Sequence, residues 1–128
     1  MKIDRFEDIV AWREARILAK MVYDAISKNE KFARDYQLRN QAIDAAVSTM
    51  SNIAEGFSRR SNKEFSQFLF ISKSSAAEVE SIFYVALDQS YISQKAFDDV
   101  YEQAEKVAKL DSGFIKYLSA RVKKYKTQ

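Results

Sequence analysis

The stretch Ser48-Thr-Met-Ser-Asn-Ile-Ala-Glu-Gly-Phe-Ser-Arg-Arg-Ser-Asn-Lys-Glu-Phe65 contains the end of one predicted helix, a basic corner and the start of another. In a helix of 3.6 residues per turn, Ser48, Asn52 and Glu55 lie in one polar line. Such a line on a packed helix favours a structural role, in which the polar groups satisfy neighbouring backbone or loop atoms. Glycine tolerates the left-handed conformation common at helix C-termini, so Gly56 is predicted to end this helix.

The corner that follows is short and positively charged. Arg59 and Arg60 come directly after the predicted helix end, and Arg59 lies one turn from Glu55, within reach of an ion pair. Ser61 with Glu64 three residues later is typical of a capping box, although Asn62 is an alternative N-cap. We therefore expect a tight basic corner between two antiparallel helices.

The composition predicts an all-α protein of one domain. The chain has 128 residues, of which 47% are hydrophobic and 30% are charged, a globular balance for a single core. It contains no proline and two glycines, so it lacks the turn residues that many short strands require. A single all-α domain over residues 1–128 is the expected fold class.

The missing residue types exclude several kinds of chemistry. Without cysteine there are no disulfides or thiolate sites, and without histidine there is no Ser-His-Asp or Cys-His catalysis. No apolar run is long enough for a membrane span, and no leader segment is recognisable. We expect a non-enzymatic cytoplasmic protein with no cofactor, metal, membrane partner or small-molecule substrate.

Hydrophobic periodicity predicts four long helices in an up-down-up-down antiparallel bundle. The first helix follows an Asp4-x-x-Glu7 start, and a polar loop is expected over residues 28–35. Ser93 is the expected N-cap of the last helix, in which Gly113 leaves a break open as an alternative. The predicted helices extend to about Ser27, from about Tyr36 to Glu55, from about Asn62 to Gln89, and from Ser93 to about Lys124.

Two of these helices carry a second apolar stripe that predicts self-association. On the first helix, Val10, Ile17 and Met21 lie nearly opposite the core face, and on the third helix Phe70 and Tyr84 do the same. The alternative is that Phe70 and Tyr84 fold back into the core of the same chain. We favour an oligomer interface formed by these residues.

Charge is unevenly distributed, although the net charge is only +3. Residues 78–111 carry eight acids against three lysines, and residues 112–128 carry five bases and no acid. Within the acidic region, Asp98, Asp99, Glu102 and Glu105 include a spacing that suits Mg²⁺, as in helical nucleotide pyrophosphatases. No matching acidic motif lies on a facing helix, so we interpret these residues as an exposed acidic face.

The specific string Ser51-Asn52-Ile53-Ala54-Glu55-Gly56, followed by Lys63-Glu64-Phe65, resembles the four-helix bundle proteins encoded in 23S rRNA intervening sequences. The opening Phe6-Glu7-Asp8-Ile9-Val10-Ala11-Trp12 and the run from Gln41 to Met50 support the resemblance. The resemblance implies a non-enzymatic homopentameric ring of four-helix bundles. It also implies kinship with the accessory variability determinant proteins of diversity-generating retroelements, which bind a reverse transcriptase and RNA.

Two hypotheses on function follow. In the first, Arg39, Arg59, Arg60 and Lys63 with the basic tail form a rim that binds the phosphates of RNA or DNA. A solvated basic corner without a ligand is the alternative interpretation of these charges. In the second hypothesis, the protein is an oligomeric scaffold or adaptor that recruits a protein partner through its second apolar stripes, without nucleic-acid binding.

Overall fold

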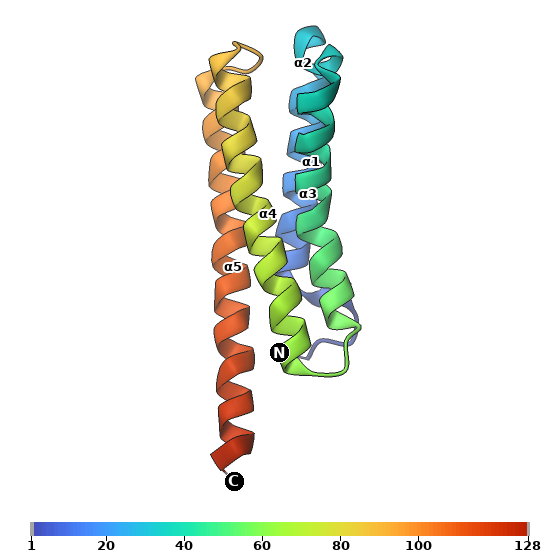
Figure 1. The fold of residues 1–128 in the computed structure, drawn as a ribbon, viewed down its shortest axis with the longest axis vertical. Helices are drawn as coiled ribbons and strands as arrows, with labels where there is room; N and C mark the ends of the chain where they lie inside the picture. Colours follow the sequence, from blue (N-terminus) through green and yellow to red (C-terminus); the bar gives the residue numbers. More distant parts are fainter. Residues whose placement is uncertain (1, 128) are drawn as a thin grey trace.

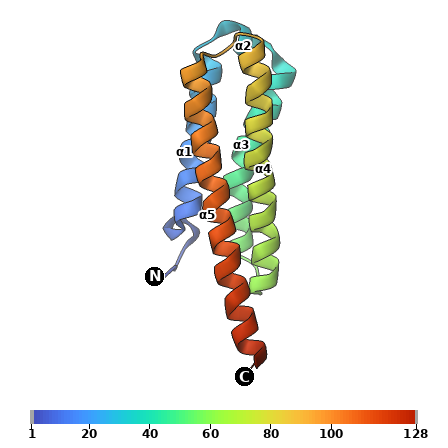
Figure 2. The ribbon, with the colours of Figure 1, turned by 90° about the vertical axis from the view of Figure 1, so that its left-hand side faces the viewer.

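The structure is a computed structural model that describes the backbone of residues 2–127 and the side chains of residues 2–121. Its four long helices run alternately up and down, and α5 extends past the end of the other three (Figures 1 and 2). Each long helix packs against two neighbours, in the cyclic order α1, α3, α4, α5. The predicted up-down-up-down all-α bundle is therefore confirmed. The elements are η1 (Phe6–Asp8), α1 (Val10–Ser27), α2 (Glu30–Arg34), α3 (Tyr36–Phe57), α4 (Asn62–Asp88) and α5 (Gln94–Thr127).

The core forms where the apolar faces of the four long helices meet on the bundle axis. Fully burying one large aliphatic or aromatic side chain stabilises the fold by about 1.5–3 kcal/mol, so this shared core holds the helices together. Its largest fully buried apolar side chains are Ile9, Leu18, Val22, Phe32, Ile53, Leu69, Val79, Phe83 and Val107.

The expectation that Gly56 ends a helix in the left-handed conformation is wrong. α3 continues through Gly56 to Phe57, and neither glycine has a positive φ. Gly56 is buried, and a Cβ added to it would lie 2.7 Å from the Cβ of Phe68 and 2.9 Å from Cδ1 of Phe65. Glycine is therefore required here because α4 approaches α3 too closely for any side chain.

The N-terminal segment also departs from its prediction. A 3-10 turn replaces the predicted first turn of helix, and α1 begins only at Val10. Asp8, and not Glu7, caps this turn: its carboxylate accepts hydrogen bonds from the backbone amides of Asp4 at 3.1 Å and Arg5 at 3.3 Å. Glu7 instead pairs with Arg5 at 2.6 Å. The Asp-x-x-Glu pattern thus misplaced the capping residue.

The segment 28–35, predicted to be a polar loop, contains the short helix α2. The Asn29 side chain caps α2 by accepting a hydrogen bond from the amide of Phe32 at 2.9 Å. Phe32 is fully buried, and its ring lies 5.4 Å from the ring of Tyr91 and 6.0 Å from that of Phe83. This single aromatic anchor draws a charged segment onto the end of the bundle.

The starts of α4 and α5 confirm the predicted N-caps. The Ser61 hydroxyl accepts from the amide of Glu64 at 3.2 Å, so Ser61 and not Asn62 is the cap, and Ser93 accepts from the amide of Ala96 at 3.1 Å. α5 continues unbroken through Gly113. The 3–4 apolar spacing of the sequence also predicts Val122 and Tyr125 on the core face of this helix, and both lie outside the residues whose side chains are described.

Gly56→Ala should lower the free energy of unfolding by about 1–3 kcal/mol, because the new methyl group overpacks the contact with Phe65 and Phe68. This loss would exceed the roughly 1 kcal/mol that alanine gains over glycine in a helix. Urea unfolding at one protein concentration measures the change. Gly113→Ala is the matched control, since a Cβ there meets nothing within 4 Å in its own chain, and it should cause no loss when both variants are unfolded at a concentration low enough to keep the chain monomeric. Equal effects of the two substitutions would contradict the close-approach interpretation.

Candidate nucleic-acid interface

Basic side chains from two parts of the chain converge at the end of the bundle where α3 turns into α4. Arg59 and Arg60 occupy the corner, and α5 brings Arg121 beside them. Together with Asn62 and Tyr117 they line an open cavity of about 410 Å³. Sequence reasoning placed Arg121 only in a general basic tail, and the structure joins it to the corner.

Two of these arginines are held in place by the chain itself. The Arg59 guanidinium donates to the Glu55 carboxylate at 2.8 Å and lies 4.6 Å from the centre of the Phe68 ring. Arg121 donates to the hydroxyl of Tyr117, and its guanidinium lies over the same ring. Such contacts reduce the side-chain freedom that binding would otherwise cost.

Other cations at this end remain uncompensated. Arg60, Lys63 and Lys116 form no ion pair within the side chains described, residues 2–121. The first backbone amides of α4, at Asn62 and Lys63, have no acceptor inside the helix, and the helix dipole adds positive potential there. The end of the bundle is therefore chemically suited to an anion such as a phosphate.

Arg39, predicted to belong to the same basic rim, lies elsewhere. It is near the start of α3, a helix about 33 Å long at 1.5 Å per residue, whereas Arg59 follows the end of that helix. Its guanidinium donates to the backbone carbonyl of Ala33 at 3.0 Å and stacks 4.7 Å from the ring of Tyr36. The structure thus unites Arg59, Arg60 and Lys63 and separates Arg39 from them.

The predicted polar line on α3 divides into two parts. The Ser48 hydroxyl lies 2.8 Å from the Ser75 hydroxyl of α4, and the Asn52 side-chain amide donates to the carbonyl and hydroxyl oxygens of Ser48, both at 2.8 Å. These bonds lie between packed helices. Glu55 points to the surface, where it forms the expected pair with Arg59.

A buried carboxyl group was missed by the sequence reasoning. Asp111 has no exposed surface, and neither of its carboxylate oxygens has a hydrogen-bond partner among the described residues. Burial raises its pKa to about 7, while the nearby Ser72 hydroxyl and the Lys73 charge act in the opposite direction. Its spacing from Ala104, Val107 and Leu118 places it on the core face of α5, which was the available signal.

The predicted acidic face on α5 adjoins an aromatic groove. Tyr84 of α4 packs against Phe97 and Tyr101 of α5, with ring centres 4.7 and 6.2 Å away, and a shallow groove of about 330 Å³ lies along them. At its edge, burial and repulsion from Glu105 raise the pKa of Glu80 to about 7. Among the described residues, no group of three or more possible ligands is arranged to hold a metal ion.

The residues predicted to form an oligomer interface have different exposures in the single chain. Val10, Ile17, Phe70 and Tyr84 are 40% to 54% exposed. Met21 is half-buried and packs against the core of its own chain. The second stripes on α1 and α4 therefore remain largely uncovered.

The fold and the surface together define a small helical-bundle protein with a basic end and exposed apolar stripes. The chain belongs to the family described as 23S rRNA-intervening sequence protein, which matches residues 7–113. Its fold is similar to that of a protein with unknown function from the S23 ribosomal protein family of Bacteroides thetaiotaomicron. That similarity has a TM-score of 0.77 at 19% identity and covers 84% of this chain and 99% of the other.

Neither the family nor this structural relative is known as an enzyme. None of the curated proteins compared with the chain matches it. Over the described residues, no helix combines the length and apolar character needed to cross a membrane.

The buried carboxyl of Asp111 predicts a pH-dependent stability. Its folded pKa of about 7 lies above the ordinary value of 3.8, so the folded state binds the proton more tightly. The free energy of unfolding should fall as pH rises from about 4 to about 7, by on the order of 4 kcal/mol, and this contribution should level off above that range. Urea unfolding of wild type and Asp111→Asn across this range measures it. The variant should lose the part of the decline that Asp111 contributes and keep a smaller one from Glu80, whose pKa is also raised to about 7, and it should exceed wild type at pH 8. Parallel curves would contradict the prediction.

Proposed function

We propose that this protein is a non-enzymatic, self-associating four-helix bundle that binds RNA or DNA through its basic end. The observation that carries the proposal is the convergence of Arg59 and Arg60 with Arg121 of α5 around one open cavity, with Lys63 next to the lining residue Asn62 in the first turn of α4. Lys and Arg side chains gain affinity for nucleic acids by neutralising phosphates and releasing counterions. Because this end presents charges and helix amides, the expected contacts are with the phosphate backbone.

Self-association supplies the number of contacts that one chain lacks. A single basic end offers only a few phosphate contacts, and at physiological salt this number gives weak binding. A ring would repeat that end around one rim, so that several weak contacts act on the same nucleic acid. We propose a homopentamer, as the resemblance to the family implies, with exposed Val10, Ile17, Phe70 and Tyr84 among the residues that it covers.

A second candidate function is an oligomeric scaffold that recruits a protein partner without binding nucleic acid. It is favoured by Ile71 and Val85, two exposed aliphatic side chains on α4. At 100° per residue they lie on a different side of the helix from Phe70 and Tyr84, so an interface built on that stripe would leave them free. In this alternative, reversal of the basic corner would leave partner capture intact.

Arg59→Glu/Arg60→Glu should abolish or strongly weaken binding to RNA while leaving the oligomer mass unchanged. A fluorescence titration with structured and single-stranded RNA at two salt concentrations measures the affinity, and light scattering on the same sample measures the mass. Wild-type affinity should fall steeply with salt, by a slope of about 0.7–0.9 per phosphate contact on a logarithmic plot.

Lys28→Glu/Lys31→Glu is the matched control for this experiment. It makes the same change in charge, and both lysines are exposed near α2 at the opposite end of the bundle (Figure 1). The control should bind RNA nearly as well as wild type. Equal loss in the two double variants would show that only the net charge matters, and no binding by an intact wild-type oligomer would favour the scaffold.

A further inference from the structure

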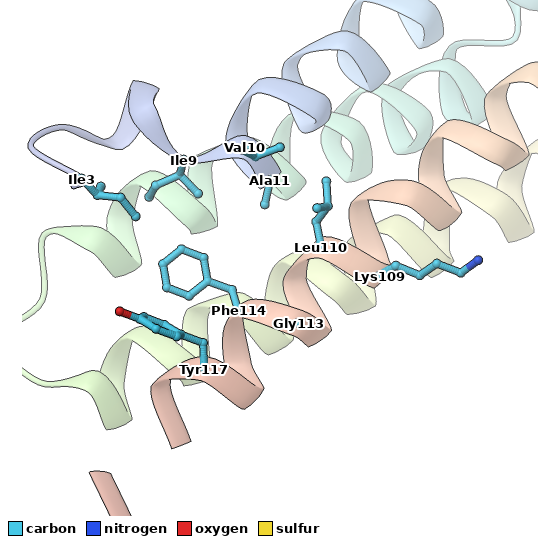
Figure 3. A pocket seen from close by; sticks show the side chains of 9 residues that line it. All are labelled: Ile3, Ile9, Val10, Ala11, Lys109, Leu110, Gly113, Phe114 and Tyr117. Atoms are coloured by element: carbon cyan, nitrogen blue, oxygen red, sulfur yellow. The ribbon is translucent and has the colours of Figure 1, made fainter. Parts of the chain in front are cut away.

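An apolar groove separates the start of α1 from α5 (Figure 3). It has a volume of about 410 Å³ and is open to solvent along its length. Ile9, Val10 and Ala11 form one wall, and Leu110 and Phe114 extend toward them from α5. Its lining is almost entirely apolar, and such a surface is normally covered in a working assembly.

Gly113 forms the open floor of this groove, and the chain itself gives no reason for a glycine there. A Cβ at this position would meet nothing within 4 Å, and the helix is regular through it. Glycine costs a helix interior about 1 kcal/mol relative to alanine. The one structural effect of Gly113 is to keep the groove open for an atom from outside the chain.

Phe70 on α4 is an exposed aromatic side chain that lies near the same height along the bundle. Its side chain is 54% exposed. Across the seam between α4 and α5, Phe65 packs against Phe114 with ring centres 5.1 Å apart, and Ser72 faces Asp111. Because these two contacts bracket Phe70, its level on α5 lies between Asp111 and Phe114, within one helical turn of Gly113.

The charges above the groove and above Phe70 are complementary. On α1, Arg16 and Lys20 flank exposed Ile17. Lys20 pairs with Asp24 of its own helix at 2.7 Å, whereas Arg16 forms no ion pair among the described side chains. On the seam of α4 and α5, the aromatic groove beside Tyr84 is bordered by acids and has no basic residue in its lining: Glu102, Glu105 and Asp98 line it, with Glu80 next to Glu105.

These two surfaces also share one height. Gln103 of α5 donates to the backbone carbonyl of Glu14 at 2.8 Å, which sets this part of α1 level with the acidic part of α5. A basic, apolar strip on one face therefore stands at the height of an acidic, aromatic strip on another.

We propose that Phe70 of one copy inserts into the groove over Gly113 of a second copy. In the same contact, the basic strip of α1 in the second copy lies against the acidic groove between α4 and α5 in the first copy. This inference rests on the proposed self-association and specifies the surfaces that form it. Each chain carries both a knob and a groove on different faces, so the contact is heterologous. Equal heights permit a rotation without a rise, and such a contact closes into a ring and does not grow into a filament.

Because α5 belongs to both contact surfaces, its position fixes how each copy is turned within the ring. The groove lies between α1 and α5, and Phe70 and the acidic groove lie between α4 and α5, so α5 takes part in both contact surfaces. These surfaces are adjacent sides of a four-helix bundle and face directions about 90° apart. Such an angle suits a small ring of about four or five copies. α5, the helix between the two contact surfaces, must therefore lie on the inner side of such a ring. The end of α5, with Arg121 beside the basic corner, is then gathered around the axis at one end of the ring.

Two variants that each block one half of the contact test the proposal. Phe70→Ala removes the inserting side chain and keeps the groove. Gly113→Leu puts a side chain into the groove, at a position where an added Cβ meets nothing within 4 Å of its own chain, and keeps Phe70. Each variant alone should have the monomer mass of 14.8 kDa by light scattering at concentrations where wild type is oligomeric. Mixed at equal concentration, they should form a heterodimer of twice the chain mass and nothing larger, because only one knob and one groove remain.

Tyr23→Ala is the matched control, since Tyr23 is an exposed aromatic on α1, about 120° around the helix from Ile17, and should keep the wild-type mass. If either interface variant alone keeps the wild-type mass, or the mixture stays monomeric although both variants are helical by circular dichroism, this docking mode is overturned while self-association stands. A wild-type chain that is monomeric at every concentration would instead overturn the proposed assembly itself, whatever the RNA titration shows.

Discussion

The close approach of α3 and α4 at Gly56 is the constraint on which the basic end depends. With 2.7 Å between a would-be Cβ and the Cβ of Phe68, the two helices touch backbone to side chain. This contact places Phe68 where the Arg59 guanidinium lies over its ring, and it places the first turn of α4 beside the corner. The charges at this end are therefore positioned by packing, and the ion pair of Arg59 with Glu55, a surface pair worth about 0.3–0.5 kcal/mol, adds little.

Polar groups inside the bundle have two opposite effects on it. The Ser48–Ser75 hydrogen bond connects α3 to α4 at one level, and the Asn52 amide supports it from within α3 by donating to the Ser48 hydroxyl. A slip of register between the two helices would break the bond to Ser75. Asp111 gains no such bonds within the described residues, so its carboxyl is a cost in the charged form. The register of α3 against α4 is thus fixed by hydrogen bonds, whereas the stability of the contact between α4 and α5 depends on the protonation of Asp111.

Much of the fold could be predicted from the sequence, because helical periodicity and the serine caps at Ser61 and Ser93 depend on local interactions. The errors arose where tertiary contacts decide. Phe32 anchors a charged segment that has no local reason to fold onto the core, and α2 was missed. The basic site could be predicted only in part, because the sequence alone does not show which residues from distant segments meet at the same end of the bundle. For that reason the predicted rim included Arg39, which lies toward the other end of α3, and included Arg121 only as part of a general basic tail.

The two glycines show why a residue type alone does not reveal its role. Both were candidates for helix ends or breaks, and both lie inside continuous helices. At Gly56 the missing side chain is replaced by atoms of the same chain, so its cause is internal packing. At Gly113 no atom of the chain occupies that space. Glycine there lowers the stability of the helix relative to alanine, and no contact inside the single chain offsets this loss. In the proposed assembly, Phe70 of a neighbouring copy would fill the space over Gly113 and offset this cost, and α5 would then carry both the contact between copies and part of the basic end.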